Sequence, residues 1–289
     1  MVTMDIFIPI YFDGEDLRYY HTKKIFNYLS IIREELKKED IILSFTVIGS
    51  NGELSRNLFN DIFKEEDDIY LEFEQKYKPK KFIYVVSPFD ESKRNDKNYV
   101  KKYKRENKEK ILFVEMLDKK FYLGWMESMK KKKDISFLMG SNDLISKSFF
   151  IQVKDNFNPS EKQIYGINRK NYCLFMQVDN KLKLSMDNVL SIWNCQYENH
   201  PKINLAGGIV GLNNFELVKD LFEKESWNEI ALEYELQKKD FKTTFVKKTY
   251  YLNIKTDNDL SGFIKTNTGI KLERIKDEIK NTFSIYNKI

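Results

Sequence analysis

Apolar and polar residues follow two different rhythms over the first 150 residues. Short apolar runs over 5–12, 41–48 and 81–86 each end at turn-forming residues, a pattern typical of buried strands. Between the first two runs, apolar residues recur at helical spacing and predict an amphipathic helix over about 16–38. A further helix is expected after Ser55, whose hydroxyl can cap it. This alternation predicts an α/β fold with a doubly wound, mostly parallel open sheet and helices on both faces.

Four further segments continue the pattern towards residue 150. The polar stretch 89–110 predicts a loop and a surface helix, and Ile111–Met116 predicts another short strand. Gly124–Met129 has helical character. The run from Ile135 to Met139 reads as a buried strand that stops at a glycine, and a helix is expected from about Leu144.

The second half is less regular. We expect a strand over 172–178, a hairpin around 181–184, a glycine-rich turn over 204–211, helices over 215–222 and 227–236, a strand-rich segment over 241–254 and an amphipathic helix over 270–287. Neither an internal repeat nor a low-complexity linker divides the chain. We therefore expect one α/β domain over 1–255 and a C-terminal helical extension over 256–289 packed on it.

Composition narrows the class of protein. The 289 residues are 42% hydrophobic and 15% aromatic, which excludes an intrinsically disordered chain. Because the apolar runs are far shorter than the roughly 18–20 residues that cross a bilayer, no transmembrane segment is expected. The first residues lack the pattern of a signal peptide, so we expect a soluble protein in the cytoplasm of its cell or host cell.

Charge and the rarer residue types exclude some kinds of chemistry. The net charge of +5 is mild, and its excess is local: residues 91–110 hold nine Lys/Arg against four Asp/Glu. We interpret these bases as a solvated helix face and expect no nucleic-acid partner. Cys173 and Cys195 belong to no CxxC pair, so we expect reduced, structural thiols. The two histidines, His21 and His200, make a histidine zinc site or a Ser-His-Asp triad improbable.

The polar triplet Ser141-Asn142-Asp143 is the strongest candidate for chemistry. It follows a buried strand directly, and ligands of open α/β sheets bind beyond the carboxyl ends of the strands. A carboxylate there can hold a divalent metal or face a phosphate. The alternative is structural, because all three residue types also favour the first position of a helix.

The order of several motifs resembles the GT-A-fold glycosyltransferases, in particular the family-2-like transferases, whose viral and bacterial members include a Gly-Ser-Asp-Asp-Leu metal motif. The resemblance covers about 5–255, and each motif alone is short. The motifs are Ile8-Pro-Ile-Tyr11, Val47-Ile-Gly-Ser-Asn-Gly52, Leu123-Gly-Trp-Met-Glu-Ser-Met129, Phe137-Leu-Met-Gly-Ser-Asn-Asp-Leu144, Gly207-Gly208, Trp227-Asn-Glu-Ile-Ala-Leu-Glu-Tyr-Glu-Leu236 and Phe241-Lys-Thr-Thr-Phe-Val246.

The resemblance implies transfer of a sugar from a nucleotide-sugar donor to a glycan or other hydroxyl acceptor, with inversion and with Mn²⁺ or Mg²⁺ on the diphosphate. It implies that Asp143 binds the metal and that Glu229 is the general base for the acceptor hydroxyl. The residues implied to bind the donor are Pro9, Tyr11, Asp13, Ser50 and Asn142. Those implied to bind the acceptor are Gly207, Gly208 and Trp227.

Two positions depart from the family pattern. Asn142 stands where the first metal-motif aspartate is usual, and Gly49-Ser50 stand where an aspartate that reads the base is common. An alternative is therefore a non-catalytic GT-A-like binding or structural protein that has lost full metal binding. A nucleotidyltransferase fits less well, because its activating loop is rich in glycine and arginine, whereas Asp13-Gly-Glu-Asp-Leu-Arg18 follows the first strand here.

Overall fold

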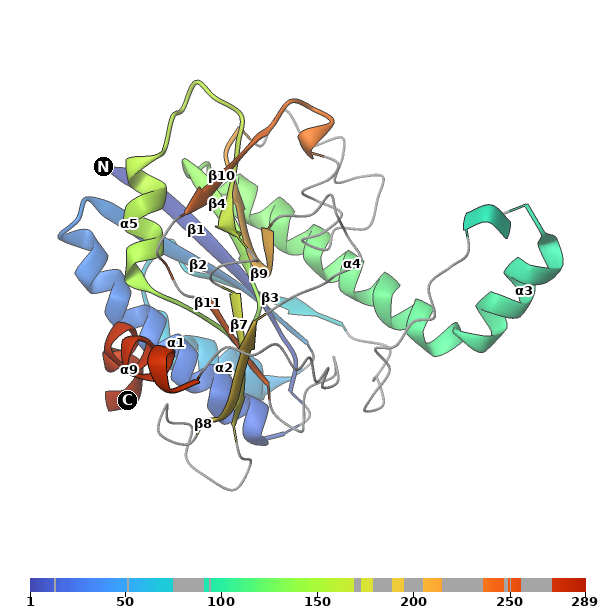
Figure 1. The fold of residues 1–289 in the computed structure, drawn as a ribbon, viewed down its shortest axis with the longest axis horizontal. Coiled ribbons are helices and arrows are strands. Elements are labelled where there is room, and N and C mark those ends of the chain that lie inside the picture. The colour runs from blue at the N-terminus through green and yellow to red at the C-terminus, as the bar shows by residue number, and fades with distance from the viewer. Residues whose placement is uncertain are drawn as a thin grey trace.

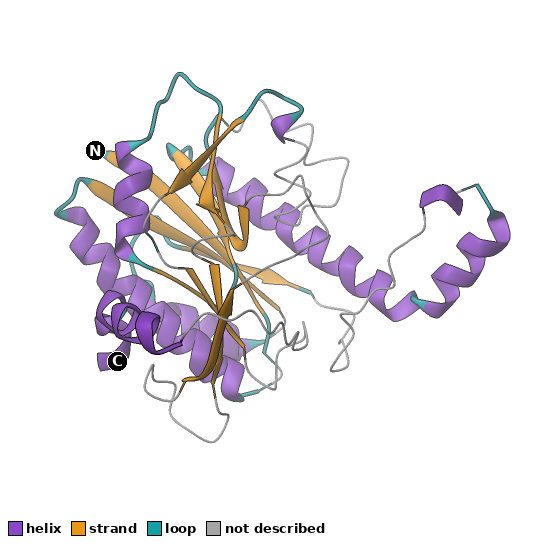
Figure 2. Ribbon diagram, viewed as in Figure 1, coloured by secondary structure: helices purple, strands orange, loops and turns teal. Residues whose placement is uncertain are grey.

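The computed structural model describes most of the N-terminal half of the chain and shorter segments of the C-terminal half. The described residues are 1–12, 14–50, 52–74, 91–93, 95–168, 173–178, 189–194, 205–214, 236–246, 249, 251–255 and 272–289. All statements below concern these residues (Figures 1 and 2).

A seven-stranded sheet forms the centre of the molecule, in the order β10-β6-β9-β4-β1-β2-β3. The strands are β1 Val2–Ile10, β2 Ile41–Ser50, β3 Ile69–Phe73, β4 Ile135–Met139, β6 Gln163–Asn168, β9 Leu205–Leu212 and β10 Lys242–Val246. Strands β3, β2, β1 and β4 are parallel to one another, and β10 is parallel to β6. Strand β9 is antiparallel to both β4 and β6. The predicted mostly parallel open sheet is confirmed.

The alternation of side chains along β1 explains why helices cover both faces of this sheet. Ile6 and Ile8 are fully buried in one core cluster with α1 (Leu17–Lys37) and α2 (Glu53–Ile62). Phe7, between them, is buried in a second cluster that includes Trp125 of α4 (Lys108–Lys130). The expected helices on both faces are therefore confirmed.

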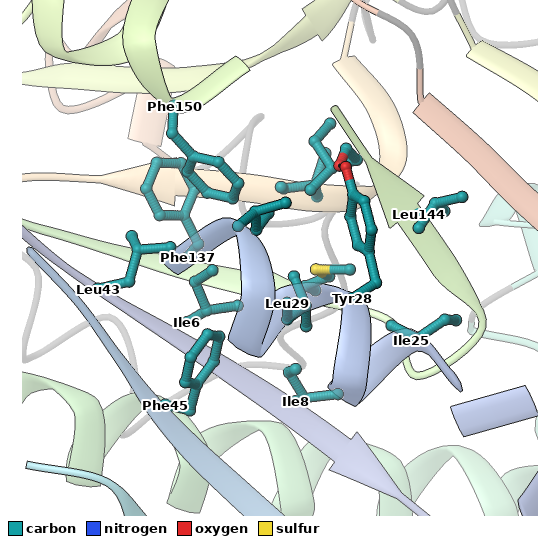
Figure 3. Packing of buried hydrophobic residues seen from close by; sticks show 14 of the residues in the cluster. Ile6, Ile8, Ile25, Tyr28, Leu29, Leu43, Phe45, Phe137, Leu144 and Phe150 are labelled. Atoms are coloured by element: carbon teal, nitrogen blue, oxygen red, sulfur yellow. The ribbon is translucent and has the colours of Figure 1, made fainter. Parts of the chain in front are cut away.

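The first core cluster is the larger one, and α1 supplies much of it. Its predicted helical span of about 16–38 is confirmed, and Asp16 caps its start by accepting hydrogen bonds from the backbone N–H groups of Arg18 and Tyr19. Figure 3 shows the packing of part of this cluster, with labels on Ile6, Ile8, Ile25, Tyr28, Leu29, Leu43, Phe45, Phe137, Leu144 and Phe150.

A second sheet of four strands has the order β5-β11-β7-β8. Its strands are β5 Asp143–Ile145, β7 Cys173–Val178, β8 Val189–Asn194 and β11 Tyr251–Lys255. Helix α5, Lys147–Asp155, follows β5 directly. The expected strands over 172–178 and within 241–254 are confirmed.

The predicted C-terminal helix is present as α9 (Leu272–Thr282) and α10 (Ser284–Lys288). Phe283 and Tyr286 are buried and pack against the ring of Tyr28 in α1, with centroid distances of 6.2 and 6.1 Å. The ammonium of Lys24 lies 4.5 Å from the centroid of the Tyr286 ring. These helices therefore complete the core on the α1 side.

Three sequence predictions are wrong. Ile111–Met116 is not a strand, because the helical period of its apolar residues continues through one 23-residue helix, α4. The helix expected from Leu144 starts only at Lys147, because Asp143–Ile145 pairs with β11 as a strand. The glycine-rich stretch 204–211 is described from Leu205 onwards, and there it is not a turn but most of β9. Gly211 lies so close to the ring of Phe137 that a side chain would collide with it.

The remaining outcomes concern β3, the polar stretch before α4 and the segments outside the described residues. Strand β3 was not predicted, and it adds a fourth parallel strand beside β2. The polar stretch before α4 holds the expected surface helix, α3 (Lys97–Glu106), preceded by a short 3₁₀ turn over Glu91–Lys93. The strand expected over 81–86, the hairpin around 181–184 and the helices expected over 215–236 lie outside the described residues, apart from Leu236.

Candidate functional site

The carboxyl ends of β1, β2, β3 and β4 share one edge of the large sheet, because these strands are parallel and adjacent. Each strand delivers a short polar or glycine-containing segment there. Tyr11 follows β1, Ser50 closes β2, and Gly140-Ser141-Asn142 follow β4. We call this the carboxyl edge, and it is the place where ligands of open α/β sheets bind.

Strand β9 adds two glycines to the same edge. It runs antiparallel to β4, and Ile209 pairs with Met139, the last residue of β4. Gly207 and Gly208 precede that pair, so they lie beside the segment that follows Met139. The register between β9 and β6 shifts between Gly166 and Asn168, at the level of these glycines. Such an irregularity re-aims a strand and is common next to functional sites.

A buried lysine from α4 reaches the carboxyl edge. The ammonium of Lys120 donates hydrogen bonds of 2.5 Å to the carbonyl oxygen of Ile10 and 2.5 Å to the hydroxyl oxygen of Ser50. It also lies 5.7 Å from the centroid of the Phe73 ring, at the end of β3. The Lys120 side chain therefore touches the last residue of three parallel strands.

The charge of Lys120 is not neutralised by any carboxylate in the part of the chain that the structure describes. Lys120 is 2% exposed, and desolvation lowers its pKa from 10.5 to about 7. A buried cation bound only to neutral oxygens is electrostatically incomplete. An anion at the carboxyl edge would complete it.

Aromatic and basic side chains surround the loop after β1. The guanidinium carbon of Arg18 lies 5.4 Å from the centroid of the Tyr11 ring, and Arg18 also pairs with Asp16 at 3.4 Å. Phe12 packs edge-on against Tyr19, with centroids 5.5 Å apart. The start of α1 is therefore joined to the loop that carries Tyr11.

The turn after β4 is held closed by Asp143. One carboxylate oxygen of Asp143 accepts a 2.9 Å hydrogen bond from the backbone N–H of Gly140. The other accepts a 2.6 Å hydrogen bond from the hydroxyl of Tyr251. Asp143 is 1% exposed, so both oxygens face protein donors in the interior. Gly140 is required here, because a Cβ at this position would lie 2.2 Å from Oδ2 of Asp143.

Helix α1 contacts the same turn. The hydroxyl of Thr22 donates a 3.4 Å hydrogen bond to the carbonyl oxygen of Ser141. His21, beside it, is buried, and its Nε2 atom has no hydrogen-bond partner. Desolvation, with a smaller contribution from Lys24, lowers the pKa of His21 from 6.5 to about 3. His21 is therefore a neutral imidazole at physiological pH.

Gly49 and Ser50 at the end of β2 stand where an aspartate is common in the transferases that the sequence resembles. Steric contacts explain why Gly49 has no side chain. A Cβ at Gly49 would lie 2.2 Å from the hydroxyl oxygen of Tyr70 in β3. The position next to it, Ser50, is occupied by its contact with Lys120. The end of β2 therefore binds a lysine where the family pattern has an acidic residue.

The structure brings most of the predicted residues that it describes to one edge. Tyr11, Ser50, Asn142, Gly207 and Gly208 belong to the carboxyl edge, as shown above. Pro9 is the second-last residue of β1 and pairs with Ile48 of β2, beyond the last pair that β1 forms with β4. A proline, which lacks an N–H group, is tolerated there. Asp13, Trp227 and Glu229 lie outside the described residues.

A metal centre is not formed by the described residues alone. Among them, no three His, Cys, Asp or Glu side chains gather closely enough to hold a metal ion. Asp143, the predicted ligand, already accepts hydrogen bonds on both oxygens. Within the part of the chain that the structure describes, which excludes Asp13 and Glu229, the donor set therefore does not by itself make a divalent metal site.

Lys120 was missed by the sequence prediction, although the sequence holds a signal for it. Lys120, Gly124, Ser128 and Lys131 follow one another at spacings of four, four and three, so they form one face of a helix. That face packs on the sheet: a Cβ at Gly124 would lie 2.5 Å from the Phe7 ring. The sequence predicted a strand over 111–116 and a separate short helix over 124–129. These four residues were therefore not recognised as one helix face.

Comparisons with known proteins return only distant likenesses. No protein-family model matches the chain, and no curated protein matches it. An inositol-1-phosphate CTP transferase from T. maritima is 15% identical, with 96% of each chain covered and a TM-score of 0.43. A 4-diphosphocytidyl-2C-methyl-D-erythritol synthase from Anaerococcus prevotii is 9% identical, with 96% of each chain covered and a TM-score of 0.42.

A galactosyltransferase, LgtC, solved with donor and acceptor sugar analogues, is 10% identical over 83% of this chain and 67% of its own, with a TM-score of 0.35. These neighbours include nucleotidyl and glycosyl transferases, and none is similar enough to assign an activity. No helix among the described residues is long and apolar enough to cross a membrane.

Proposed function

We propose that this chain is a glycosyltransferase that binds a nucleotide-sugar donor at the carboxyl edge and transfers the sugar to a hydroxyl acceptor. One observation carries the proposal: the buried ammonium of Lys120 lies at the ends of three parallel strands with neutral oxygens as its hydrogen-bond acceptors. A nucleoside diphosphate supplies the negative charge that such an edge attracts.

The donor residues follow from this placement. Tyr11, Ser50 and Asn142 come from three adjacent strands at the edge, and Pro9 fixes the backbone before Tyr11. We propose that they bind the base and ribose together with Asp13. The positive charge of Lys120 then favours the diphosphate through the low-dielectric interior, where electrostatic interactions are strong.

The acceptor residues remain predictions carried by position and sequence. Gly207 and Gly208 lie beside the turn after β4, where an absent side chain lets a sugar approach the backbone. Trp227 is proposed to stack on that sugar, and Glu229 is proposed as the base. In the transfer, the acceptor oxygen bonds to the anomeric carbon as the bond from that carbon to the phosphate oxygen breaks. The hydroxyl proton passes to Glu229, and the nucleoside diphosphate leaves.

The described residues do not by themselves make a site for Mn²⁺ or Mg²⁺. Asp143 stays our predicted ligand for a metal held mainly by the donor's own phosphates. To bind it, the Asp143 carboxylate must share an oxygen that already accepts a hydrogen bond from Gly140 or Tyr251.

A second candidate is a non-catalytic binding protein on the same fold. The observation that favours it is the role of Asp143, whose buried carboxylate closes a turn and anchors Tyr251. A residue committed to such contacts can persist without catalysis. This candidate retains nucleotide binding at the carboxyl edge and lacks transfer.

Calorimetry with UDP, GDP and CMP, each with and without Mn²⁺, tests nucleotide binding. Lys120→Met should weaken binding by about tenfold or more, because it removes the cation facing the diphosphate. Lys64→Met, at an exposed position away from the edge, is the matched control and should leave the affinity unchanged.

Activity is then tested with a panel of nucleotide sugars, with hydrolysis and transfer both followed. Turnover that Glu229→Gln abolishes supports the glycosyltransferase. Binding without turnover of any donor supports the non-catalytic candidate. The absence of binding by every nucleotide would contradict both.

A further inference from the structure

The most strongly charged part of the molecule is separate from the carboxyl edge. It consists of the 3₁₀ turn Glu91–Lys93, α3 and the first residues of α4, that is, the described residues 91–93 and 95–112, here called the arm. Figure 1 shows α3 and the start of α4 extending away from the sheet and the helices that cover it.

The arm carries the excess charge of the whole chain. Residues 91–110 hold nine Lys/Arg and four Asp/Glu, a difference of +5, and the net charge of all 289 residues is also +5. The other 269 residues therefore sum to zero. This concentration on one projecting element is not a general property of a basic protein.

Within α3, the bases lie on one side. Lys97, Lys101, Lys104 and Arg105 fall within a sector of about 100° at the helical period of 3.6 residues. All four are exposed, and none has an ion-pair partner among the described residues. No side chain of α3 is buried. Among the described residues, the helix therefore presents a basic face without ion-pair partners.

The opposite side of α3 is aromatic. The rings of Tyr99 and Tyr103 are half-buried and lie 6.2 Å apart, centroid to centroid. The ammonium of Lys93 lies 5.4 Å from the centroid of the Tyr99 ring. These rings thus contact each other and Lys93 instead of standing free. A single-stranded nucleic acid needs exposed rings for its bases to stack on, so this surface is poorly suited to one.

We propose that the basic face of α3 docks on an anionic phospholipid surface. Clustered Lys and Arg side chains on one face of a helix are attracted by anionic headgroups, each adding to the affinity. A projecting helix can lie along a flat surface without a collision from the rest of the protein. Leu112, which is 40% exposed at the start of α4, adds apolar surface to the same arm.

Vesicle flotation of the full chain tests the proposal. Vesicles of phosphatidylcholine with 30% phosphatidylglycerol are compared with vesicles of phosphatidylcholine alone, at roughly 0.15 M salt, where the Debye length is about 8 Å. The protein should float with the anionic vesicles and not with the neutral ones. Raising the salt to roughly 1 M, with a Debye length of about 3 Å, should release it.

The decisive variant replaces the four bases of the α3 face: Lys97→Gln, Lys101→Gln, Lys104→Gln and Arg105→Gln. Binding should fall by about 100-fold or more. The matched control replaces four exposed lysines outside the arm: Lys38→Gln, Lys64→Gln, Lys132→Gln and Lys288→Gln. Both variants lower the net charge from +5 to +1, so only the position of the charges differs, and the control should bind like the wild type.

A further variant, with Lys97, Lys101 and Lys104 each changed to Arg, keeps the charge and should retain binding. Circular dichroism and the melting temperature check that each variant is folded. Equal losses in the face variant and the control outside the arm would overturn the proposal, as would a wild type that ignores anionic vesicles. Binding of single-stranded RNA through the same four bases, without vesicle binding, would assign the arm to nucleic acid instead. None of these outcomes depends on nucleotide binding at the carboxyl edge, so the test is independent of the proposed function.

Discussion

Two lysines join α4 to the strands: Lys120 is buried within the helix, and Lys131, directly after its last residue, has a side chain that is 6% exposed. The surroundings of the two lysines differ. Lys131 donates a 2.6 Å hydrogen bond to the carboxylate of Asp5, near the start of β1, and a 3.0 Å bond to the carbonyl oxygen of Phe45. Lys120, eleven residues earlier on the same face, contacts the carbonyl oxygen of Ile10 and the hydroxyl of Ser50.

The Asp5 end is electrostatically complete. Its carboxylate also accepts hydrogen bonds from the hydroxyls of Ser44, Thr46 and Ser128 at 2.7, 2.9 and 2.5 Å. Burial lowers the pKa of Lys131, and the charge of Asp5 acts in the opposite direction. With four donors to one buried carboxylate, this network joins α4 to β1 and β2 and leaves no capacity for a ligand.

Lys120 likewise joins α4 to β1 and β2, but its hydrogen-bond acceptors among the described residues are neutral oxygens and no carboxylate. Burial of a lysine alone therefore does not indicate a functional site. A buried lysine indicates one when no carboxylate balances its charge. A complete network stabilises the fold, whereas an incomplete one at the carboxyl edge holds charge that a ligand can use. Four substitutions test this contrast, in order of decreasing effect.

Asp5→Ala should cause the largest loss. It removes the larger counter-charge of the Lys131 ammonium, that of Asp5, and leaves only the more distant charge of Asp68. Breaking a largely buried pair in this way costs about 3–5 kcal/mol. Urea unfolding measures the change in the free energy of unfolding. The double variant Asp5→Ala with Lys131→Met should recover part of that loss. A loss under about 1 kcal/mol for the single variant would show that the Asp5–Lys131 pair stabilises the fold no more than a surface ion pair does. The contrast with Lys120 would then not hold.

Lys120→Met should change stability in the opposite direction. Burial lowers the pKa of Lys120 in the folded protein to about 7, from its ordinary value of 10.5. Below pH 7 the folded protein therefore bears the full cost of a buried charge. Between these two pKa values the unfolded chain holds a proton that the folded protein has released, so wild-type stability rises with pH. Removing the amine should raise the melting temperature by about 5 °C at pH 6.

The gain from Lys120→Met should shrink as the pH rises from 7 towards 10, which scanning calorimetry at four pH values can follow. Lys64→Met provides the control, since its exposed side chain should give no such dependence. A melting temperature that falls at pH 6 would mean that the two hydrogen bonds of Lys120 outweigh its desolvation.

Gly124→Ala tests the middle of the same helix face. The added Cβ would lie 2.5 Å from the Phe7 ring, so α4 must move away from β1 between the two lysines. Overpacking of this kind costs about 1–3 kcal/mol. Denaturant unfolding measures it, and a gain in stability, as expected for alanine in an unconstrained helix, would contradict the close contact.

Tyr251→Phe should have the smallest effect. It removes the 2.6 Å hydrogen bond to the buried carboxylate of Asp143 and should cost about 1–2 kcal/mol. It also frees a carboxylate oxygen. If Asp143 binds a metal with the donor, the affinity for UDP or GDP in Mn²⁺ should rise relative to the wild type. An affinity that Mn²⁺ does not affect in either protein would assign Asp143 to structure alone.

The regular parts of the fold were predictable because their patterns are long. The apolar residues of α1 repeat at helical spacing, and β1 and β2 are mostly apolar runs interrupted by a few polar residues such as Asp5, Ser44 and Thr46, so the hydrophobic pattern located them. Strand β3 was missed because its five residues follow the acidic stretch 65–68 and have no clear alternation. It forms because β2 offers an edge for it to pair with, and such a tertiary cause leaves little local signal.

The candidate site was predictable in position and not in detail. The Ser141-Asn142-Asp143 triplet was located by its place after a buried strand, whereas Tyr11 and Ser50 were implied by the family resemblance. They share one edge because the carboxyl ends of adjacent parallel strands do. The partners of Asp143 could not be foreseen, since Tyr251 is 108 residues away. Lys120 was concealed for a related reason: its significance depends on the ends of strands about 50 to 110 residues earlier in the chain.

The contact between α1 and the C-terminal helices has a consequence for synthesis. Tyr28 is 255 residues ahead of Phe283, whose ring it meets in the folded core. At roughly 5–20 residues per second, a ribosome needs about 13–50 s to make the intervening chain. Throughout that time the Tyr28 face of α1 has no α10 to cover it. Contacts this distant in sequence also form slowly. The nascent protein should therefore depend on chaperones that shield apolar helices more than its sheet of neighbouring parallel strands suggests.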